Sequence, residues 1–558
     1  MTLTGTNNAI TFTEVDDVNH PRATYIYSAP AAGPAHLNHG KRGDSWGRVD
    51  VANAPSGTAA VSWSPKTLLD FLIDVFLPAG YPHSVTDDYV PYQIFDSLQA
   101  FSSSIAGLLS SRAVLQGVGV GNASASPTSA LLLHILQDSS GRVATILFAH
   151  RVGTALEPEC KMYRLAADVF NDLAMILDCL SPMIPAGAPR VTVLSTAGVL
   201  RALCGVAGGS SKASLSAHFS RWGNLAEVNA VSHRCPPPSQ TRRTWPYSAH
   251  YHLQKDSSQE TIISLIGMLV GSFVVSHVTG FAATWISLLF LLALHLGMNY
   301  AAVRSVQMTS LNRQRANIVF STLLASDPDL SSQFLTIHPD HEHQKNDTHD
   351  QPSWRTLTPA QVANQEKIFE IDGILRWSQA AAAPQTLGSC QIGVSLQQFL
   401  APSSSSSFSS SSSSLIPGLR ATPRSLRTPI PLPHLSTLFS EESYILYLSP
   451  TSKRIRVGNW HARILLKNTS TTHSQLKAWA HALLAARILS RSSSSSHSSA
   501  AVSTENEMLE SIVDVLDRTL QFLNENGRFE RYVASLVDAG WDPSVAALET
   551  RSGRRIVL

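Results

Sequence analysis

The chain has 558 residues, of which 44% are hydrophobic and 15% charged, with 42 Lys and Arg against 40 Asp and Glu. This length is enough for about three or four ordinary domains. The net charge of only +2 gives no sign of a polyanionic partner, so we expect no nucleic-acid binding. The five cysteines form no CxxC pair, which is typical of thiols that stay reduced.

The first part of the chain carries little structural signal. The first thirty residues contain no long apolar run, and they include Asp16 and Asp17. Both features argue against a secretory signal and against an acid-poor transit peptide. We expect residues 1–66 to form a disordered N-terminal region.

Two groups of polar residues then recur at helical spacing, which places each group on one helix face. The first group is Asp88, Tyr89, Tyr92, Gln93, Asp96 and Gln99, and the second is Lys161, Arg164, Asp168, Asn171 and Asp172. They are the candidates for ligand binding. They also fit helix-to-helix hydrogen bonds and interfacial anchoring, which a membrane bundle needs because unpaired polar groups are costly in lipid. We favour the second interpretation.

The strongest physical signal is residues 261–303, which are 43 consecutive residues without Asp, Glu, Lys or Arg. One helix of this length would reach about 65 Å, roughly twice the hydrocarbon core of a bilayer. We therefore expect two membrane spans with a turn at residues 276–280. Gly267 and Gly271 form a GxxxG step, which is typical of close helix packing in membranes. A buried hairpin in a soluble bundle is the alternative.

Polar residues in and around this stretch refine the expectation. His277 and His295 lie inside the spans, where we expect neutral imidazoles bonded to a neighbouring helix rather than a polar path. The flanking cations, Lys255, Arg304, Arg313 and Arg315, fit a hairpin with both ends on the cytosolic or matrix side. Residues 191–209 are long enough for a third span. Arg201 in its middle would cost about 2.5 kcal/mol or more against lipid, so this helix would face a protein interior.

The chain changes character after residue 325. Residues 326–436 are rich in His, Ser and Pro, and we expect a disordered linker. Its potential zinc ligands are His338, Asp340, His341, His343, His349 and Asp350. Nothing apolar nearby would hold their geometry, so we expect no metal site.

The C-terminal part contains shorter elements. Residues 437–490 combine two short strand patterns, YILYL and RIRV, with the one-sided helix QLKAWAHALLAARIL, and they predict a small α+β module. We expect a Ser-rich linker at residues 491–504. Two amphipathic helices should follow within residues 505–558, separated at Asn526 and Gly527.

Several long motifs occur in a fixed order. They are FLIDVFLPAGYPHSVTDDYVPYQIFDSLQA, ILFAHRVGTALEPECKMYRLAADVFNDLAMIL, HFSRWGNLAEV, KDSSQET and LHLGMNYAAVRSVQMTSLNRQRANIV. They resemble the motifs of the root UVB sensitive family, although Phe95 stands where that family usually has Trp. The resemblance covers about residues 69–324, and a GWD phrase near the C-terminus extends it. It implies a membrane-associated protein tied to vitamin B6 homeostasis, light responses and development in plants, with no established biochemical activity.

One segment departs from the family pattern. In the family the HFSRWGNLAEV motif runs almost directly into KDSSQET, whereas residues 231–254 intervene here. The segment begins with Val-Ser and ends with Gln, which codons at the two ends of an intron can encode, and its length keeps the reading frame. We interpret it as a retained intron, in which case Cys235, Arg242 and Arg243 have no functional meaning. A genuine lineage-specific loop is the alternative.

Taken together, these patterns predict a mainly α protein, with a multi-helix integral membrane domain at residues 67–325 and a small α+β C-terminal module. Lys161 or Lys255 could form a Schiff base, but no phosphate cradle or pyridinium partner accompanies them. We therefore expect no catalytic residue, no cofactor and no enzyme. The expected partners are the lipid bilayer and another family member or protein, in a mitochondrial or endomembrane membrane.

We expect an adaptor or scaffold in vitamin B6 homeostasis. The alternative is a carrier-like transporter of a small metabolite, which would need polar residues from several spans to converge at mid-membrane.

Overall fold

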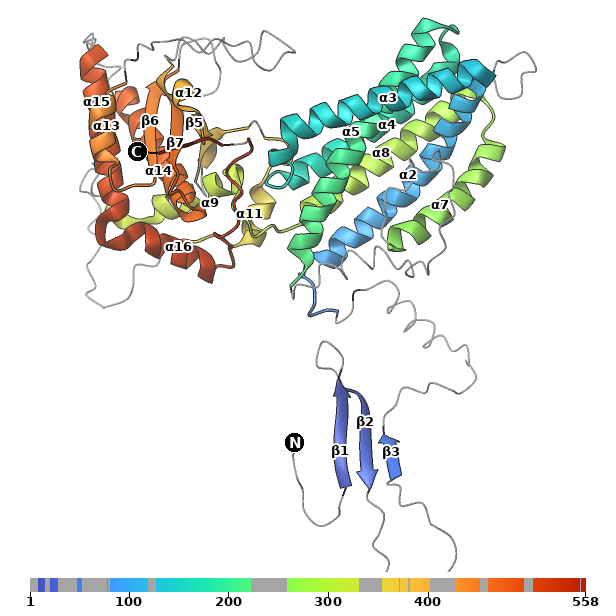
Figure 1. The fold of residues 1–558 in the computed structure, drawn as a ribbon, viewed down its shortest axis with the longest axis horizontal. Helices are drawn as coiled ribbons and strands as arrows, with labels where there is room; N and C mark the ends of the chain where they lie inside the picture. Colours follow the sequence, from blue (N-terminus) through green and yellow to red (C-terminus); the bar gives the residue numbers. More distant parts are fainter. Residues whose placement is uncertain are drawn as a thin grey trace, which may run out of the picture. The chain divides into compact units, whose positions relative to one another are not determined.

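The computed structural model describes residues 9–15, 21–28, 48–52, 78, 81–118, 127–221, 258–330, 354–370, 372–379, 382–401, 428, 430–451, 460–495, 505–551 and 553–557. The chain divides into two compact units, Met1–Tyr89 with Phe219–Ile262 and Val90–His218 with Ile263–Leu558. The described residues are mainly helical, as predicted, with an N-terminal sheet and a C-terminal sheet (Figure 1).

The first unit contains a three-stranded antiparallel sheet, which corrects the expectation of disorder throughout residues 1–66. Its strands are β1 (Ala9–Val15), β2 (Pro21–Ser28) and β3 (Arg48–Ala52), in that order. Phe12 pairs with Tyr25, and Ile10 pairs with Tyr27. The aromatic pair of Phe12 and Tyr25 across two strands favours this pairing, although each strand alone is a short and weak signal.

The second unit begins with a bundle of long helices. These are α2 (Tyr89–Val118), α3 (Pro127–Val152), α4 (Cys160–Leu180), α5 (Ala188–Phe219), α7 (Ser258–His277) and α8 (Phe281–Ser305) (Figure 1). The break between α7 and α8 lies at the predicted turn. Arg112 of α2 fixes this break, because its guanidinium donates to the carbonyls of Val275 and Val278, each at 2.7 Å. The predicted break between two helices is therefore confirmed, whereas the crossing of a membrane by both helices stays a prediction.

Two glycines set the contact between α7 and α2. A Cβ atom at Gly267 would lie 2.9 Å from the carbonyl oxygen of Phe101, and one at Gly271 would lie 3.1 Å from Cα of Ile105. Both distances are too short for a side chain, so the predicted GxxxG step is where the two helix backbones approach each other.

The second half of this unit is an α+β module around one sheet. The sheet has the order β4 (Ile374–Gln379), β5 (Ala382–Ile392), β7 (Trp460–Lys467) and β6 (Tyr444–Pro450), and β8 (Arg555–Ile556) adds to β7. Strand β7 is parallel to β5 and antiparallel to β6. Helices α9 (Arg313–Ser326) and α14 (Thr472–Ser495) pack against the sheet. Trp479 of α14 is fully buried and donates to Asn317 of α9 at 3.0 Å.

Smaller helices complete the module. They are α11 (Pro359–Gln365), α12 (Leu396–Leu400), α13 (Leu432–Leu438), α15 (Glu505–Asn524) and α16 (Arg528–Asp538). The break before α16 lies at Asn526 and Gly527, whose φ angles are +51° and +62°. This left-handed conformation suits glycine and asparagine, and it confirms the predicted separation of the last two helices.

The module is larger than predicted. Helices α11 and α12 and strands β4 and β5 lie inside residues 326–436, where we expected a linker, and α9 belongs to this core although the prediction placed it in the membrane domain. Strand β5 pairs with β7 about seventy residues later, so its place depends on a partner remote in the sequence. Helix α14 also runs into the expected Ser-rich linker. The retained-intron segment, the His-rich segment and RIRV lie outside the described residues.

The glycine contact gives a first prediction. Replacing Gly267 with Ala should lower the thermal midpoint of the protein in detergent, because the new methyl group would push the carbonyl of Phe101 and separate α7 from α2. Gly297→Ala in α8 is the matched control, since nothing lies within 4 Å of a Cβ atom there. Alanine is favoured over glycine in a helix by about 1 kcal/mol, so the control should be neutral or stabilising. Equal midpoints for both variants would contradict the close contact.

Candidate functional site

Charged residues from two helices meet inside the bundle. Arg164 of α4 donates to Asp96 of α2 at 2.7 Å and to both carboxylate oxygens of Asp168 at 3.2 Å. Its Nε also lies 3.4 Å from the hydroxyl of Tyr92. All four side chains are buried. The two carboxylates balance the positive charge of the buried guanidinium. Removing any one of these partners would therefore lower the stability of the fold.

A third helix joins this group. His295 of α8 is buried, with its Nδ1 2.7 Å from Asp172 and its Nε2 4.0 Å from Asp168, both on α4. This contact with a neighbouring helix is the one expected for His295. His277 differs, because it is exposed and its Nδ1 lies 2.9 Å from the carbonyl of Phe273 in its own helix. One turn beyond His295, Asn299 is fully buried, and its amide has no hydrogen-bond partner among the described residues.

A separate polar contact holds α5 against α4. Asp178 is buried, accepts a hydrogen bond from Ser110 of α2 at 2.9 Å and forms an ion pair with Arg201 of α5. The arginine in the middle of the apolar segment 191–209 is therefore paired with a buried carboxylate of a neighbouring helix, although its own side chain is 38% exposed.

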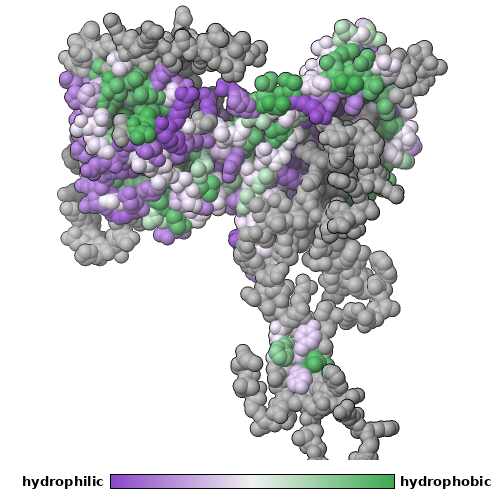
Figure 2. Space-filling model, in the orientation of Figure 1, coloured by the Kyte–Doolittle hydropathy of each residue, from purple (hydrophilic) through white to green (hydrophobic). Residues whose placement is uncertain are grey.

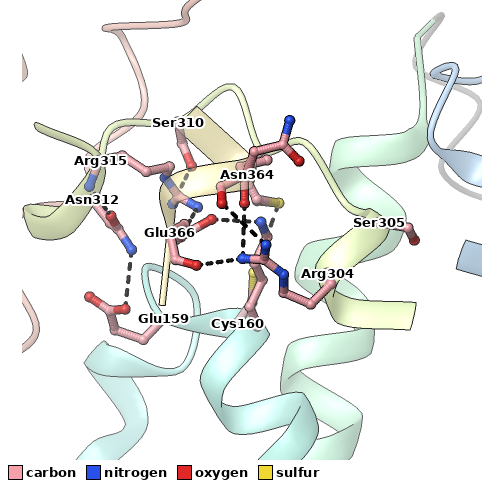
Figure 3. Close-up of polar contacts among 12 residues, drawn as sticks. Glu159, Cys160, Arg304, Ser305, Ser310, Asn312, Arg315, Asn364 and Glu366 are labelled. Carbon is pink, nitrogen blue, oxygen red and sulfur yellow. Dashed lines mark hydrogen bonds and ion pairs between the residues drawn. The ribbon is translucent and has the colours of Figure 1, made fainter. Parts of the chain in front are cut away.

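The second cluster joins the bundle to the C-terminal module (Figure 3). Glu366, directly after α11, accepts from Lys161 of α4 at 2.6 Å and from Arg315 of α9 at 3.2 Å. The three side chains are no more than 6% exposed. We call these residues, Lys161, Glu366 and Arg315, the junction triad.

Arginine 304, at the end of α8, strengthens the same junction. Its guanidinium donates to the carbonyls of Ala363, Asn364 and Glu366 at 3.2, 3.2 and 2.6 Å (Figure 3). These carbonyls end α11 and carry its negative dipole, which a cation stabilises. The sequence suggested Arg304 and Arg315 only as flanking cations that indicate which side of a membrane the ends of the hairpin face. In the structure, both residues also make contacts of the junction.

The junction sets the ionisation of Glu366. Burial would raise the pKa of its carboxyl group, but Arg315 and Lys161 outweigh burial and hold that pKa below its usual value. Glu366 is therefore ionised at neutral pH, and it contributes stability that is lost as the pH falls below about 4.5.

The structure brings together only part of the predicted set. Tyr92, Asp96, Arg164 and Asp168 meet directly, Asp172 reaches them through His295, and Lys161 joins the junction instead. Gln93 and Asn171 are half-buried beside these contacts, and Asp88 is buried in the first unit.

Sequence reasoning missed Glu366, because it lies in a segment that we expected to be a linker. Among the described residues, no group of three or more His, Cys, Asp or Glu is arranged to hold a metal ion.

The junction triad gives a second prediction. Replacing Glu366 with Gln should lower the free energy of unfolding by roughly 3 kcal/mol, because it leaves two buried cations without a counter-charge. The deficit should shrink as the pH falls below about 4.5, because Glu366 of the unfolded wild type takes up a proton there while the folded protein still holds it ionised. Asp138→Asn is the control, since its pair with Arg142 is partly exposed and should contribute less than about 1 kcal/mol. Urea unfolding in detergent at several pH values measures both, and equal stabilities would contradict a buried anchor.

Comparisons with known proteins agree with the sequence motifs. The family model described as "Vitamin B6 photo-protection and homoeostasis domain" matches residues 62–233 and 253–327, and "Root UVB sensitive protein, C-terminal" matches residues 436–554. The gap between the first two segments lies within residues 231–254, whose origin as a retained intron stays a prediction. No solved structure matches the chain.

Curated relatives come from an amoeba and a plant. "RUS family member 1" of Dictyostelium discoideum is 38% identical over 265 residues, which are 47% of this chain and 45% of that protein. "Protein root UVB sensitive 3" of Arabidopsis thaliana is 33% identical over 263 residues, covering 47% of this chain and 54% of that protein. "Protein root UVB sensitive 2, chloroplastic" of the same plant is 29% identical over 169 residues, or 30% and 37%. The match thus spans about half the length of the first two relatives or less. With both family models matched along most of its length, this chain belongs to the root UVB sensitive family.

Proposed function

We propose that this protein is a non-enzymatic membrane adaptor or scaffold in vitamin B6 homeostasis. In this proposal the helical bundle lies in the bilayer and holds the C-terminal module at its surface. The observation that carries the proposal is the distribution of polarity in the bundle, where charged side chains are paired inside and large apolar side chains point outward.

The outward face of the bundle supports membrane insertion. Helices α5 and α8 are long and apolar enough to cross a bilayer, and residues 262–277 form a shorter apolar helix. Exposed apolar side chains gather on α3, α7 and α8: Leu131, Leu132, Ile135, Ile146, Leu147, Leu269, Phe273, Phe281, Ile286 and Phe290 are each more than half exposed. Figure 2 shows part of this apolar surface over the bundle. An apolar surface of this extent is costly in water and suits contact with lipid.

The junction supports the scaffold role. Lys161 and Arg304 belong to bundle helices, whereas Glu366 and Arg315 belong to the C-terminal module. Since the two ion pairs of Glu366 are buried and two of the three Arg304 contacts are partly buried, the module is fixed to the bundle, and it would hold a constant orientation toward the membrane.

One observation favours a carrier as the second candidate. A connected series of side chains runs across α2, α4 and α8: Asp96, Arg164, Asp168, Asp172 and His295. Asn299 lies one turn from His295, and its buried amide has no hydrogen-bond partner among the described residues. Buried ionisable groups inside transmembrane helices are typical of transport pathways. Because each ionisable member of this series already has a polar partner on the same or a neighbouring helix, we favour a structural role for them.

Membrane insertion gives a third prediction. The protein should stay in the pellet after alkaline carbonate extraction, and Phe290→Lys should release much of it, because a lysine near the centre of a lipid-facing helix costs about 2.5 kcal/mol or more. Phe369→Lys in the C-terminal module is the matched control, since Phe369 is also exposed. It should leave the pelleted fraction unchanged. Recovery of most wild-type protein in the soluble fraction would contradict the proposal.

The buried ion pairs give a fourth prediction. Asp96→Ala and Lys161→Ala should each lower the steady-state level of the protein, because each removes one of the two opposite charges that hold a buried partner, Arg164 or Glu366, at a cost of up to about 3–5 kcal/mol. Complementation of a strain lacking the protein should fall in proportion to that level. Normal abundance with lost complementation would instead favour the carrier, because a residue that lines a pathway can be truncated without unfolding the bundle.

A further inference from the structure

A cavity of about 160 Å³ lies where the bundle meets the C-terminal module. Its walls come from the end of α3, the start of α4, the start of α9, the residues before β4 and the C-terminal tail. An enclosed space of about 150 Å³ is enough for one six-membered ring. The cavity is therefore large enough for a small metabolite, and its lining decides which kind.

The lining carries three arginines and three acidic residues, but two of the arginines have no acidic partner among the described residues. Arg313 pairs with Asp372, and Glu370 pairs with Arg376 at 3.0 Å. Arg151 and Arg551 also line the cavity, and both are exposed. Neither has an ion pair or a hydrogen bond within the part of the chain that the structure describes. Two arginines from separate elements are thus available to one ligand.

Tyrosine 163 adds a neutral donor to this wall. Burial raises the pKa of its hydroxyl, so the group keeps its proton at neutral pH. Its ring is held edge-on by Phe148, with the ring centroids 6.4 Å apart, and the hydroxyl makes no hydrogen bond to any other described residue. The unused polar groups of the cavity are therefore two cations and one hydrogen-bond donor, a set that fits an anion.

Glutamate 159 is the remaining acid of the lining. It accepts from Asn312 at 3.1 Å, and burial is the main cause that raises the pKa of its carboxyl to about 7. The charged groups that face it are Arg313 and Arg315 of α9, Glu366 after α11 and Asp372 before β4. Below about pH 7 this carboxyl is neutral, and it then does not repel an anion.

We propose that this cavity binds a small phosphate monoester, with Arg151 and Arg551 binding the phosphate and Tyr163 donating a hydrogen bond to it. A phosphate monoester carries a charge of about −1.5 to −2 at neutral pH, which matches two arginines, and arginine binds phosphate in a bidentate geometry. The proposal rests on the proposed function in one respect, the choice of a phosphorylated B6 vitamer as the probe.

Titration calorimetry of the full chain in detergent tests the site. Pyridoxine 5′-phosphate is the probe, because it lacks the aldehyde that would react with lysines, and pyridoxine is its match without the phosphate. We expect the phosphorylated vitamer to bind at least about tenfold more tightly than pyridoxine. The double variant Arg151→Gln with Arg551→Gln should lose this difference. Arg518→Gln removes a surface arginine of α15 outside the cavity and should preserve it.

The variant Glu159→Gln tests, independently of the arginine variants, whether the charge of Glu159 affects binding of the anion in the cavity. At pH 8 the variant should bind pyridoxine 5′-phosphate several-fold more tightly than wild type, because the wild-type carboxylate is then ionised and repels the ligand. At pH 6 the two affinities should converge. Comparing the proteins at each pH removes the titration of the ligand itself from the result. Equal or weaker binding by the variant at pH 8 would overturn the role of Glu159 and, with it, the electrostatic basis of the site.

Two other results would overturn the proposal. The first is equal affinity for the two vitamers, or an undiminished affinity in the double arginine variant. The second is displacement of the vitamer by phosphatidic acid in the micelles more effectively than by inorganic phosphate. That result would identify a lipid phosphate as the natural ligand of the cavity. Membrane insertion is measured separately by carbonate extraction, so failure of this site and failure of the proposed function remain distinguishable.

Discussion

The buried carboxylate of Glu366 is the contact on which the arrangement of the second unit depends. It lies between Lys161, from a helix of the bundle, and Arg315, from a helix that packs on the C-terminal sheet. Two buried cations need a counter-charge, and Glu366 supplies it for both. Arg304 binds the carbonyls around the same residue, so one short segment after α11 connects three helices. The bundle and the module are joined by charge in a place from which water is largely excluded.

The bundle itself inverts the usual distribution of polarity. Its ion pairs, Asp96 with Arg164 and Asp178 with Arg201, and the contact of Asp172 with His295 lie between helices, whereas leucine and phenylalanine side chains are exposed on α3, α7 and α8. In water such a surface would drive association, while in lipid it has a favourable environment. In the proposed bilayer, which offers little hydrophobic driving force between helices, paired charges would also give each helix a defined partner.

Glu159 connects the cavity with the junction triad, because it lines the cavity and interacts electrostatically with Arg315 and Glu366. Glu159 precedes α4 by one residue, and its carboxyl is influenced first by burial and then by Arg315, the same arginine that binds Glu366. Occupation of the cavity by an anion would therefore act on charges next to the contact that fixes the module. This proximity gives a physical route by which a bound metabolite can alter how firmly the module is held, which is a property that an adaptor can use.

The sequence alone determined the features that depend on local pattern. An uncharged run of 43 residues required two helices, glycines at a four-residue spacing required a close helix contact, and Asn526 with Gly527 required a break. It also placed Tyr92, Asp96, Arg164 and Asp168 on helix faces. Only the tertiary structure decided the remaining features, because each of them depends on a partner that is remote in the sequence. Lys161 leaves its own helical set for Glu366, 205 residues away, and β5 becomes a strand because β7 pairs with it. The segment around Glu366 has too few apolar residues to be recognised by itself, and it is ordered by charges that only the fold brings to it.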